Sequence, residues 1–302
     1  MDTVKEQGPF LSVFTSTYNR AALLERTYAS LCRQSCKDFE WIIVDDGSTD
    51  NTWERVEQWC QEENGFPIRY VWKDNGGLHT GYNMAISMLR GKLAVCIDSD
   101  DYMPDDAVEI IKTCWREKGG DEYGGIIGLD ASITDGTIGE FLPERETLNL
   151  IAWTYEGPPY NKGDKKLVIR SDLYKKVAPM KVFPGEKYFN PHYMHLLIGR
   201  EYDFLVLNER LCVVDYQSNG MSARMFEQYK NSPNSFLEIR KLHFSFPNVR
   251  LASKLRTGVH FVSSALLAHR FCREFKASRH KGILLLCFFP GLLLTGLVLL
   301  KG

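Results

Sequence analysis

Strand and helix signals alternate along the first 118 residues, and this alternation restricts the fold more than any other feature of the chain. Apolar, β-prone runs predict strands at Phe10–Thr15, Phe39–Val44, Ile68–Trp72 and Leu93–Ile97. Helical spacing and helix-start residues predict helices at Ala21–Cys36, Thr49 to about Asn64, Leu78–Leu89 and Pro104–Lys118. Such alternation is typical of an α/β domain in which helices cover both faces of a mostly parallel sheet.

Each of the four predicted strands ends in a loop rich in Asp, Asn, Ser, Thr or Gly. These loops begin after Thr15, Val44, Trp72 and Ile97. Open α/β sheets bind ligands at the carboxyl ends of their strands. We therefore expect the chemistry of this chain in these loops. Weaker strand signals follow at Gly125–Leu129, Lys166–Ser171 and Phe204–Cys212.

The fourth loop, Asp98-Ser99-Asp100-Asp101, places three acids within four residues directly after an apolar strand. Strand alternation would direct Asp98 and Asp100 to the same side. Like charges this close repel each other, and a divalent cation would relieve the repulsion. Carboxylate oxygens on a short loop suit Mg²⁺ or Mn²⁺ held together with substrate phosphates. A solvated acidic turn is the alternative interpretation.

Two other loops give weaker signals. Asp45-Asp46-Gly47-Ser48 follows the second strand, and it is either a ligand-binding loop or a turn with helix-capping residues. Asn75-Gly76-Gly77 precedes the third helix, whose N-terminus can approach a diphosphate or a sugar closely because the glycines carry no side chain.

Taken together, four motifs resemble the family 2 glycosyltransferases with the GT-A fold. They are Thr15–Arg20, Phe39–Thr52, Asn75–Gly77 with Asn83, and Asp98–Asp101, in this order and at the family's spacing. The resemblance is strong over about residues 10–115 and weak to about residue 222. It implies a GT-A-like nucleotide-binding sheet, an Asp-x-Asp metal motif, and transfer of a hexose-type sugar with inversion at the anomeric carbon.

The resemblance also implies residue roles. Thr15 and Tyr18 would line the nucleotide pocket, and Asp46 would hydrogen-bond the base. Asn75, Gly77 and Asn83 would contribute to the nucleotide-sugar site. Asp100 would hold a Mn²⁺ or Mg²⁺ ion that bridges the two phosphates. Asp98 would share the metal site and lie nearer the ribose and the sugar.

The general base is expected in the second half of the chain, where family members carry an Asp or Glu ahead of an aromatic-rich helix. In the segment Phe183–His192, Glu186 is the one acid before the predicted helix, so it is our first candidate. His192 is the second candidate, and Asp101 is also considered catalytic. Glu186 could instead pair with Lys187 or solvent.

Composition excludes several classes of protein. The net charge of −1 does not suggest nucleic-acid binding. No Gly-x-Gly-x-x-Gly motif follows the first strand, which argues against a dinucleotide oxidoreductase. The eight cysteines include no Cys-x-x-Cys pair, so reduced thiols are expected rather than a disulfide framework or a zinc site.

The C-terminal region is basic and then apolar. Residues 250–281 contain eight Lys or Arg and one acid, a net charge of +7, and Val259–Phe275 has amphipathic spacing that suits a helix on an anionic membrane surface. Gly282–Leu300 holds 19 residues without a charge, near the ~20 needed to span a bilayer. It is a candidate transmembrane or membrane-inserted helix, and a buried hairpin or a re-entrant segment is the alternative because Pro290 lies mid-segment.

These observations predict three regions. They are a GT-A-like domain over 1–222, a basic amphipathic helical region over 223–281 and the apolar segment 282–300. The predicted function is metal-assisted transfer of a sugar from a nucleotide-diphosphate sugar to a glycan or lipid-linked glycan, as in polysaccharide biosynthesis. No export signal is recognised, and the positive-inside rule predicts a cytoplasmic catalytic domain attached to the membrane at its C-terminal end. A catalytically inactive, membrane-attached nucleotide-sugar-binding module is the alternative.

Overall fold

The structure is a computed structural model that describes residues 8–134, 136–156, 163–215, 224–247 and 249–302. The chain divides into two compact units. The first unit comprises Met1–Asn75, Thr80–Pro179 and Met194–Tyr216, and the second comprises Gly76–His79, Met180–Tyr193 and Gln217–Gly302. The predicted boundary between residues 222 and 223 lies outside the described residues.

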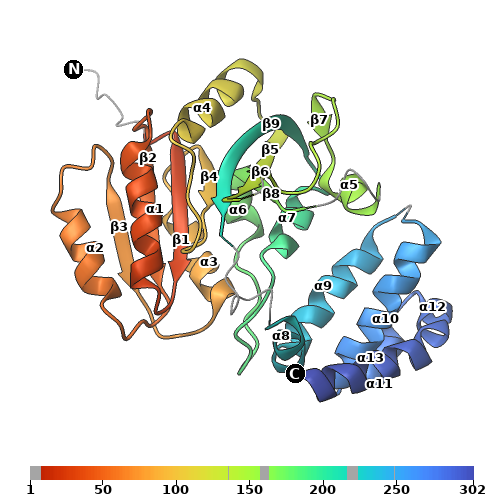
Figure 1. Ribbon diagram of the computed structural model, residues 1–302. Coiled ribbons are helices and arrows are strands. Elements are labelled where there is room, and N and C mark those ends of the chain that lie inside the picture. The colour runs from red at the N-terminus through yellow and green to blue at the C-terminus, as the bar shows by residue number, and fades with distance from the viewer. Residues whose placement is uncertain (1–7, 135, 157–162, 216–223, 248) are drawn as a thin grey trace, which may run out of the picture. The chain divides into compact units, whose positions relative to one another are not determined.

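The first unit is built on a mixed sheet, which has nine strands in the part of the chain that the structure describes (Figure 1). The strands are β1 (Leu11–Thr17), β2 (Phe39–Asp45), β3 (Ile68–Trp72), β4 (Leu93–Cys96), β5 (Tyr123–Ser132), β6 (Gly136–Thr137), β7 (Thr147–Leu148), β8 (Lys165–Arg170) and β9 (Asp203–Val214). Their order is β3-β2-β1-β4-β8-β5-β9-β7, and β6 pairs with β5.

Strands β1 to β4 form the parallel half of this sheet. Leu11 at the start of β1 pairs with Phe39 on β2 and with Leu93 on β4, and β2 in turn pairs in parallel with β3. The loops that follow these four strands therefore leave the same edge of the sheet. The predicted α/β fold with a parallel core is confirmed, while β8 is antiparallel to both β4 and β5 and makes the sheet mixed.

The described residues that precede β9 form seven helices. They are α1 (Ala21–Arg33), α2 (Thr52–Cys60), α3 (Leu78–Met88), α4 (Ala107–Lys118), α5 (Leu150–Glu156), α6 (Ser171–Val177) and α7 (His192–Ile198). One core cluster joins apolar residues of α1, α2 and α4 to those of β1 and β2. On the other face of β1, Phe14 makes edge-to-face contacts with Tyr82 of α3 and Tyr174 of α6. Helices thus cover both faces, as the alternating sequence pattern predicts.

Two features of these helices differ from the sequence prediction. The helix expected from Thr49 begins at Thr52, because Asp50 turns back and accepts a hydrogen bond from the Thr52 amide (3.2 Å). The short helices α5, α6 and α7 have seven residues each, and of these only α7, the helix expected after Glu186, was predicted. Helices of two turns are not stable from local sequence alone, so tertiary packing determines them.

The second unit consists mainly of helices α8 (Met225–Asn231), α9 (Pro233–Ser245), α10 (Leu251–Leu267), α11 (Phe271–Ala277), α12 (Lys281–Leu286) and α13 (Phe288–Lys301). Phe261 and Val262 of α10 are buried in a core with Leu237 of α9 and Leu284 of α12. The amphipathic segment Val259–Phe275 therefore directs its apolar side into this unit. It is also not one helix, because it breaks at His269, whose φ is +54°.

The apolar segment Gly282–Leu300 also differs from the expectation of one helix. It forms parts of α12 and α13, with the break at Cys287, whose thiol lies 3.3 Å from the Leu255 carbonyl oxygen. Pro290 lies in the first turn of α13, where a missing amide hydrogen has no intrahelical partner to lose. Over the residues that the structure describes, no helix combines the length and apolar character needed to cross a bilayer.

Candidate nucleotide-sugar site

The loops after β1 and β2 are tied to each other. Asn19 adopts a positive φ of 51°, and its amide donates to the Ser48 hydroxyl (2.8 Å). The Asn19 side-chain oxygen accepts from the Thr49 amide (2.7 Å). Asp50 accepts from the Ala21 amide at the start of α1 (3.1 Å). These contacts fix the edge of the sheet where the predicted ligand loops meet.

Asp46, the predicted base-binding residue, is 4% exposed and is held in place by a cation. Its Oδ1 lies 2.5 Å from the Lys73 ammonium, which also donates to the Thr80 hydroxyl (2.8 Å). The backbone carbonyl of Asp46 accepts from the Asn75 side-chain amide (2.8 Å). The structure therefore brings together Asp46 and Asn75, and it adds Lys73, to which the sequence analysis gave no role.

The acidic loop lies beyond β4, because that strand ends at Cys96. Asp98 and Asp100 therefore lie in a turn, in which the Asp101 amide donates to the Asp98 carbonyl oxygen (2.9 Å). Because they lie outside the strand, strand alternation does not determine the direction of their side chains. The Arg20 guanidinium donates to Asp100 Oδ2 (2.8 Å). Arg20 comes from the loop after β1, so two strand-end loops meet at this carboxylate.

Charge at the acidic loop is partly buried. Burial raises the pKa of Asp100, and repulsion from Asp98 adds to the shift while Arg20 opposes it. Burial also raises the pKa of Asp101 to about 7. Lys166 on β8 is 12% exposed and lies with its ammonium 3.6 Å from Asp130 Oδ1. Burial favours the neutral form of Lys166, but the negative charges of Asp130, Asp101 and Asp98 raise its pKa well above its usual range.

Asp101 fastens the loop to its surroundings. Its carbonyl oxygen accepts from the Thr27 hydroxyl of α1 (2.7 Å), and its carboxylate accepts from the Asp215 amide after β9 (3.3 Å). The next residue, Tyr102, exchanges two backbone hydrogen bonds with Val213 on β9. These contacts give Asp101 a clear anchoring role.

The other predicted residues of the first unit lie at different depths. Thr15 is fully buried, and its hydroxyl accepts from the Trp41 indole nitrogen (3.0 Å), which places this side chain in the core. Tyr18 follows β1 and is 48% exposed at the edge where the predicted ligand loops leave the sheet. Asn83 is half-buried on α3.

Gly77 belongs to the second unit, and the backbone geometry at this position requires a glycine. Its φ is +92°, and a Cβ at this position would lie 1.9 Å from the Lys187 carbonyl oxygen. Only glycine accommodates both the dihedral angle and this close approach. Gly77 is thereby packed directly against the segment that carries Glu186.

Glu186, the first candidate for the base, is 6% exposed and accepts four hydrogen bonds. Its Oε1 accepts from the amide and side chain of Asn234 (2.8 and 2.9 Å), and its Oε2 accepts from the amide and hydroxyl of Ser235 (2.8 and 2.7 Å). A carboxylate has about four lone-pair sites, and all are used here. Glu186 thus caps the N-terminus of α9, where its negative charge is favoured.

His192, the second candidate, begins α7 and belongs to the second unit. Burial lowers the pKa of its imidazole to about 4, so the ring is neutral at pH 7. Its backbone amide donates to the Asn190 side-chain oxygen (2.9 Å).

The donor set fits a divalent ion that is shared with a substrate. Within the described ranges, no three His, Cys, Asp or Glu side chains converge into a protein-only metal cage. Asp98 and Asp100 offer two carboxylates, and the raised pKa of Asp100 shows a carboxylate that positive charge would stabilise. Mg²⁺ is commonly bound by one or two carboxylates with phosphates and water completing its shell.

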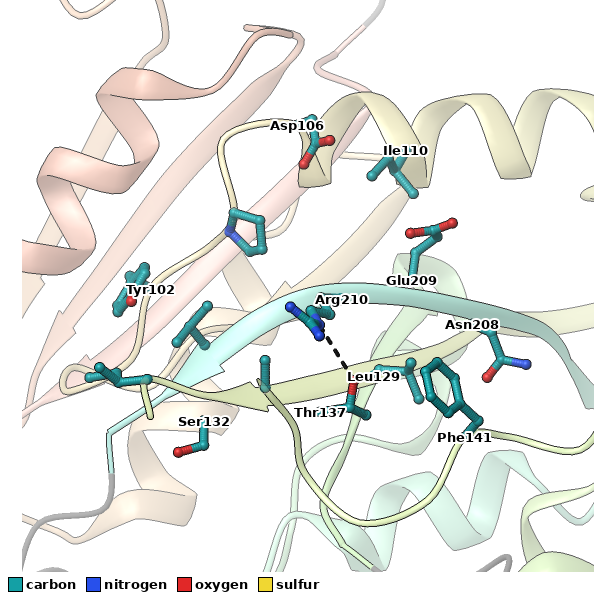
Figure 2. A pocket seen from close by; sticks show the side chains of 14 residues that line it. Tyr102, Asp106, Ile110, Leu129, Ser132, Thr137, Phe141, Asn208, Glu209 and Arg210 are labelled. Atoms are coloured by element: carbon teal, nitrogen blue, oxygen red, sulfur yellow. Dashed lines mark hydrogen bonds between the residues drawn. The ribbon is translucent and has the colours of Figure 1, made fainter. Parts of the chain in front are cut away.

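A cavity of about 630 Å³ opens elsewhere in the first unit (Figure 2). Apolar residues of β5 and β9, such as Leu129 and Val213, line it, and Arg210 donates to the Thr137 hydroxyl at its side (3.4 Å). Tyr102 also lines it, but none of the predicted site residues does.

Three cations near the predicted site residues carry no predicted role: Arg20, Lys73 and Lys166. Arg20 lies inside the first motif, so its place two residues after Tyr18 was the available signal. Lys73 is the first residue of the third loop, whereas Lys166 lies in a strand whose pairing with β4 is visible only in the folded sheet.

Comparison with known proteins agrees with this architecture. Residues 12–139 match the sequence model of the family described as Glycosyl transferase family 2. Chondroitin synthase from Pasteurella multocida (strain Pm70) is 37% identical over 109 residues, which are 36% of this chain and 11% of that relative. The chain spans between about a tenth and two fifths of the length of the relatives it matches.

Two solved structures share the fold. S. aureus TarS 1–349 in complex with UDP-GlcNAc has a TM-score of 0.56 and 18% identity, covering 86% of this chain and 83% of that one. Mannosyltransferase PcManGT from Pyrobaculum calidifontis, in complex with GDP-Man and Mn2+, has a TM-score of 0.57 and 16% identity, covering 96% and 80%. The fold is therefore GT-A-like, and the region 12–139 is similar in sequence to the family 2 glycosyltransferases.

Proposed function

We propose that this protein transfers a hexose-type sugar, with inversion, from a nucleotide-diphosphate sugar to a glycan or lipid-linked glycan, as in polysaccharide biosynthesis. One observation carries the proposal. The acidic loop 98–101 follows β4 inside the family-matching region and meets the loop after β1 through Arg20 and Asp100.

Asp98 and Asp100 are the residues that would hold Mn²⁺ or Mg²⁺. When bound, such an ion acts as a Lewis acid and stabilises the charge that develops on a leaving diphosphate. The similarity to PcManGT, solved with GDP-Man and Mn2+, supports this assignment. Arg20 neutralises Asp100 in the free protein and is placed to contact an anionic ligand at the same edge.

We assign the remaining roles residue by residue. Asp46, oriented by Lys73, would accept hydrogen bonds from the nucleotide base, and the exposed ring of Tyr18 would pack against it. Asn75, Gly77 and Asn83 would complete the donor site. We keep Glu186 as the proposed general base, with His192 and Asp101 as alternatives. A base of this kind removes the acceptor hydroxyl's proton as the sugar is transferred.

A membrane acceptor is part of the proposal. The basic and apolar C-terminal region supports attachment to the cytoplasmic face of a membrane, where lipid-linked glycans are presented. An inactive binding module is the alternative, and it is favoured by the carboxylates of Asp100 and Glu186 being already engaged by protein groups.

Binding and turnover together test the function. We expect UDP- or GDP-sugars to raise the thermal unfolding midpoint with Mn²⁺ present, because a ligand at 100 times its dissociation constant adds about 2.7 kcal/mol to the free energy of unfolding. Labelled donor should be hydrolysed or transferred. Asp100→Ala should abolish both effects and keep the fold, while the control Asp105→Ala, on an exposed neighbouring residue, should keep both.

Two results would contradict the proposed function. Full turnover in Asp100→Ala, or in excess chelator, would refute the metal assignment. Donor binding without hydrolysis or transfer under any acceptor condition would establish the binding module instead.

A further inference from the structure

Helix α13 has its polar and apolar sides reversed relative to a helix of a water-soluble protein. Its buried side carries Gly291, Thr295 and Val298. Thr295 donates to the Ser263 hydroxyl of α10 (3.1 Å), and a Cβ on Gly291 would lie 2.6 Å from Val262 of the same helix. Small and polar groups thus form the contact with α10.

The outward side of α13 and the end of α12 are apolar. At about 3.6 residues per turn, Phe289, Leu293 and Leu300 lie opposite the buried side of α13. Eight large apolar side chains are exposed here by 39% to 86%: Leu285, Leu286, Phe289, Leu292, Leu293, Leu297, Leu299 and Leu300. We call these eight residues the leucine face. Contiguous exposed apolar surface of this kind marks a partner or a membrane.

Positive charge flanks the leucine face. Arg273 and Lys276 are exposed on α11, Arg279 is exposed between α11 and α12, and Lys281 is exposed at the first position of α12. None of these four makes an ion pair with an acid of the described chain. The one acid after residue 249, Glu274, is buried and paired with Lys241 (2.8 Å) and Arg270 (3.1 Å). The exposed charge beside the leucine face is therefore of one sign.

We infer that the leucine face docks the protein on an anionic bilayer, with α12 and α13 lying in the plane of one leaflet. The inference rests on the membrane acceptor of the proposed function and specifies the attachment. Helices with Leu and Phe on one side and adjacent Lys and Arg bind the boundary between headgroups and acyl chains. A second copy of the chain would instead bring the four flanking cations of two protomers together without acids to pair them.

The inference is tested by sedimentation of the full chain with phosphatidylcholine vesicles, with and without phosphatidylglycerol. The double variant Leu293→Gln/Leu300→Gln should lower vesicle partitioning about tenfold or more, because it removes two large apolar anchors. Leu251→Gln is the matched control, since Leu251 is 65% exposed on α10 in the same unit, and it should bind like the unmodified chain.

A second pair of variants tests the charge. Arg273→Glu/Lys276→Glu should lower binding to anionic vesicles about tenfold or more, from about 1 kcal/mol for each lost basic contact, and high salt should reduce the difference. Arg116→Glu/Lys118→Glu on exposed positions of α4 should have no such effect.

Donor hydrolysis without membranes separates this inference from the proposed function. Leu293→Gln/Leu300→Gln should keep that hydrolysis while it loses vesicle binding. Unchanged vesicle binding would overturn the membrane assignment, and loss of a dimer in size-exclusion chromatography with unchanged vesicle binding would assign the face to a second copy.

Discussion

The acidic edge of the first unit and helix α13 of the second depart from the usual distribution of side chains in opposite ways. Around Asp101 and Asp130, charged groups are buried, and Lys166 lies among them. On α13, leucines are exposed and Thr295 is buried. Ordinary interiors exclude unpaired charge, and ordinary surfaces avoid contiguous apolar area.

The difference separates two kinds of ligand. Buried carboxylates with few cations favour a site that gains from an added divalent cation, which can in turn hold a diphosphate. An exposed leucine face beside unpaired lysine and arginine favours an apolar, negatively charged surface. Real proteins depart from consistent folding rules mainly where function requires it. The four predictions below test whether both departures are of this kind.

The largest effect is expected from removing the buried cation of the first unit. Lys166→Met leaves Asp130 without its ion-pair partner and should lower the free energy of unfolding by about 3–5 kcal/mol. Urea unfolding measures this. Lys176→Met is the control, because its ion pair with Glu201 is more than half exposed on both sides and should contribute about 1 kcal/mol or less. Equal losses in both variants would show that burial does not distinguish the pairs.

The second prediction concerns the role of Glu186, a buried acid of the second unit. If it is the base, Glu186→Gln should lower turnover about 10²–10⁴-fold and keep donor binding. If it only caps α9, the same change should leave turnover intact and lower stability by about 0.5–2 kcal/mol, since the amide nitrogen cannot accept from Ser235. Steady-state kinetics and thermal unfolding of one variant separate the two roles. Unchanged turnover directs the search to His192.

We expect low pH to destabilise the second unit in particular. Burial lowers the pKa of His192 and His260 to about 4 and that of His243 to about 3, with Arg240 adding to the shift for the last two. The unfolded chain takes up protons below about pH 6.5 while the folded imidazoles stay neutral, so stability is lost as pH falls from 6.5 towards 4. We expect a loss of about 1–3 kcal/mol at pH 5.5, discounted for partial exposure.

The first unit offers the internal reference for this measurement. Burial raises the pKa of Asp130, so the folded state keeps a proton that the unfolded state loses, and this contribution strengthens as pH falls towards 4. Hydrogen exchange of peptides from each unit, at pH 7.5 and 5.5, reports both signs. Equal protection of α9 and α10 at the two pH values would contradict the expectation.

The smallest effect is expected at the leucine face. In the absence of membranes, Leu293→Gln should change the free energy of unfolding by less than about 0.5 kcal/mol, because the side chain is 76% exposed. Leu284→Gln, one helix earlier but fully buried, is the contrasting variant and should be strongly destabilising. A large loss from Leu293→Gln would mean that this leucine packs against protein.

The parallel half of the fold and the position of the polar loops were predictable because both depend on local pattern. Apolar runs became β1 to β4, and the polar loops after them meet at one edge because parallel strands share a direction. Asp46, Asn75, Asp98 and Asp100 lie in these loops, and their roles in ligand binding stay predictions. The family match over residues 12–139 agrees with that analysis.

What the sequence did not reveal depends on contacts between distant segments. Lys166 reaches Asp130 only because β8 pairs with β5, and Glu186 caps α9 across 48 residues. Thr15 belongs to the core because Trp41 of the neighbouring strand reaches its hydroxyl. The break at Cys287 likewise depends on packing against α10. The spacing of residues along the chain does not reveal these contacts.

The close approach of Gly77 to Lys187 has a consequence for how mutations in this chain are read. Any side chain at residue 77 collides with backbone rather than with a flexible neighbour, so every substitution there should score as severely as loss of an acidic-loop residue. A screen for lost activity would place Gly77 beside Asp100. If every active variant keeps this glycine, the reason is the lack of space for a side chain beside the main chain. Its retention is then no evidence about which sugar the protein selects.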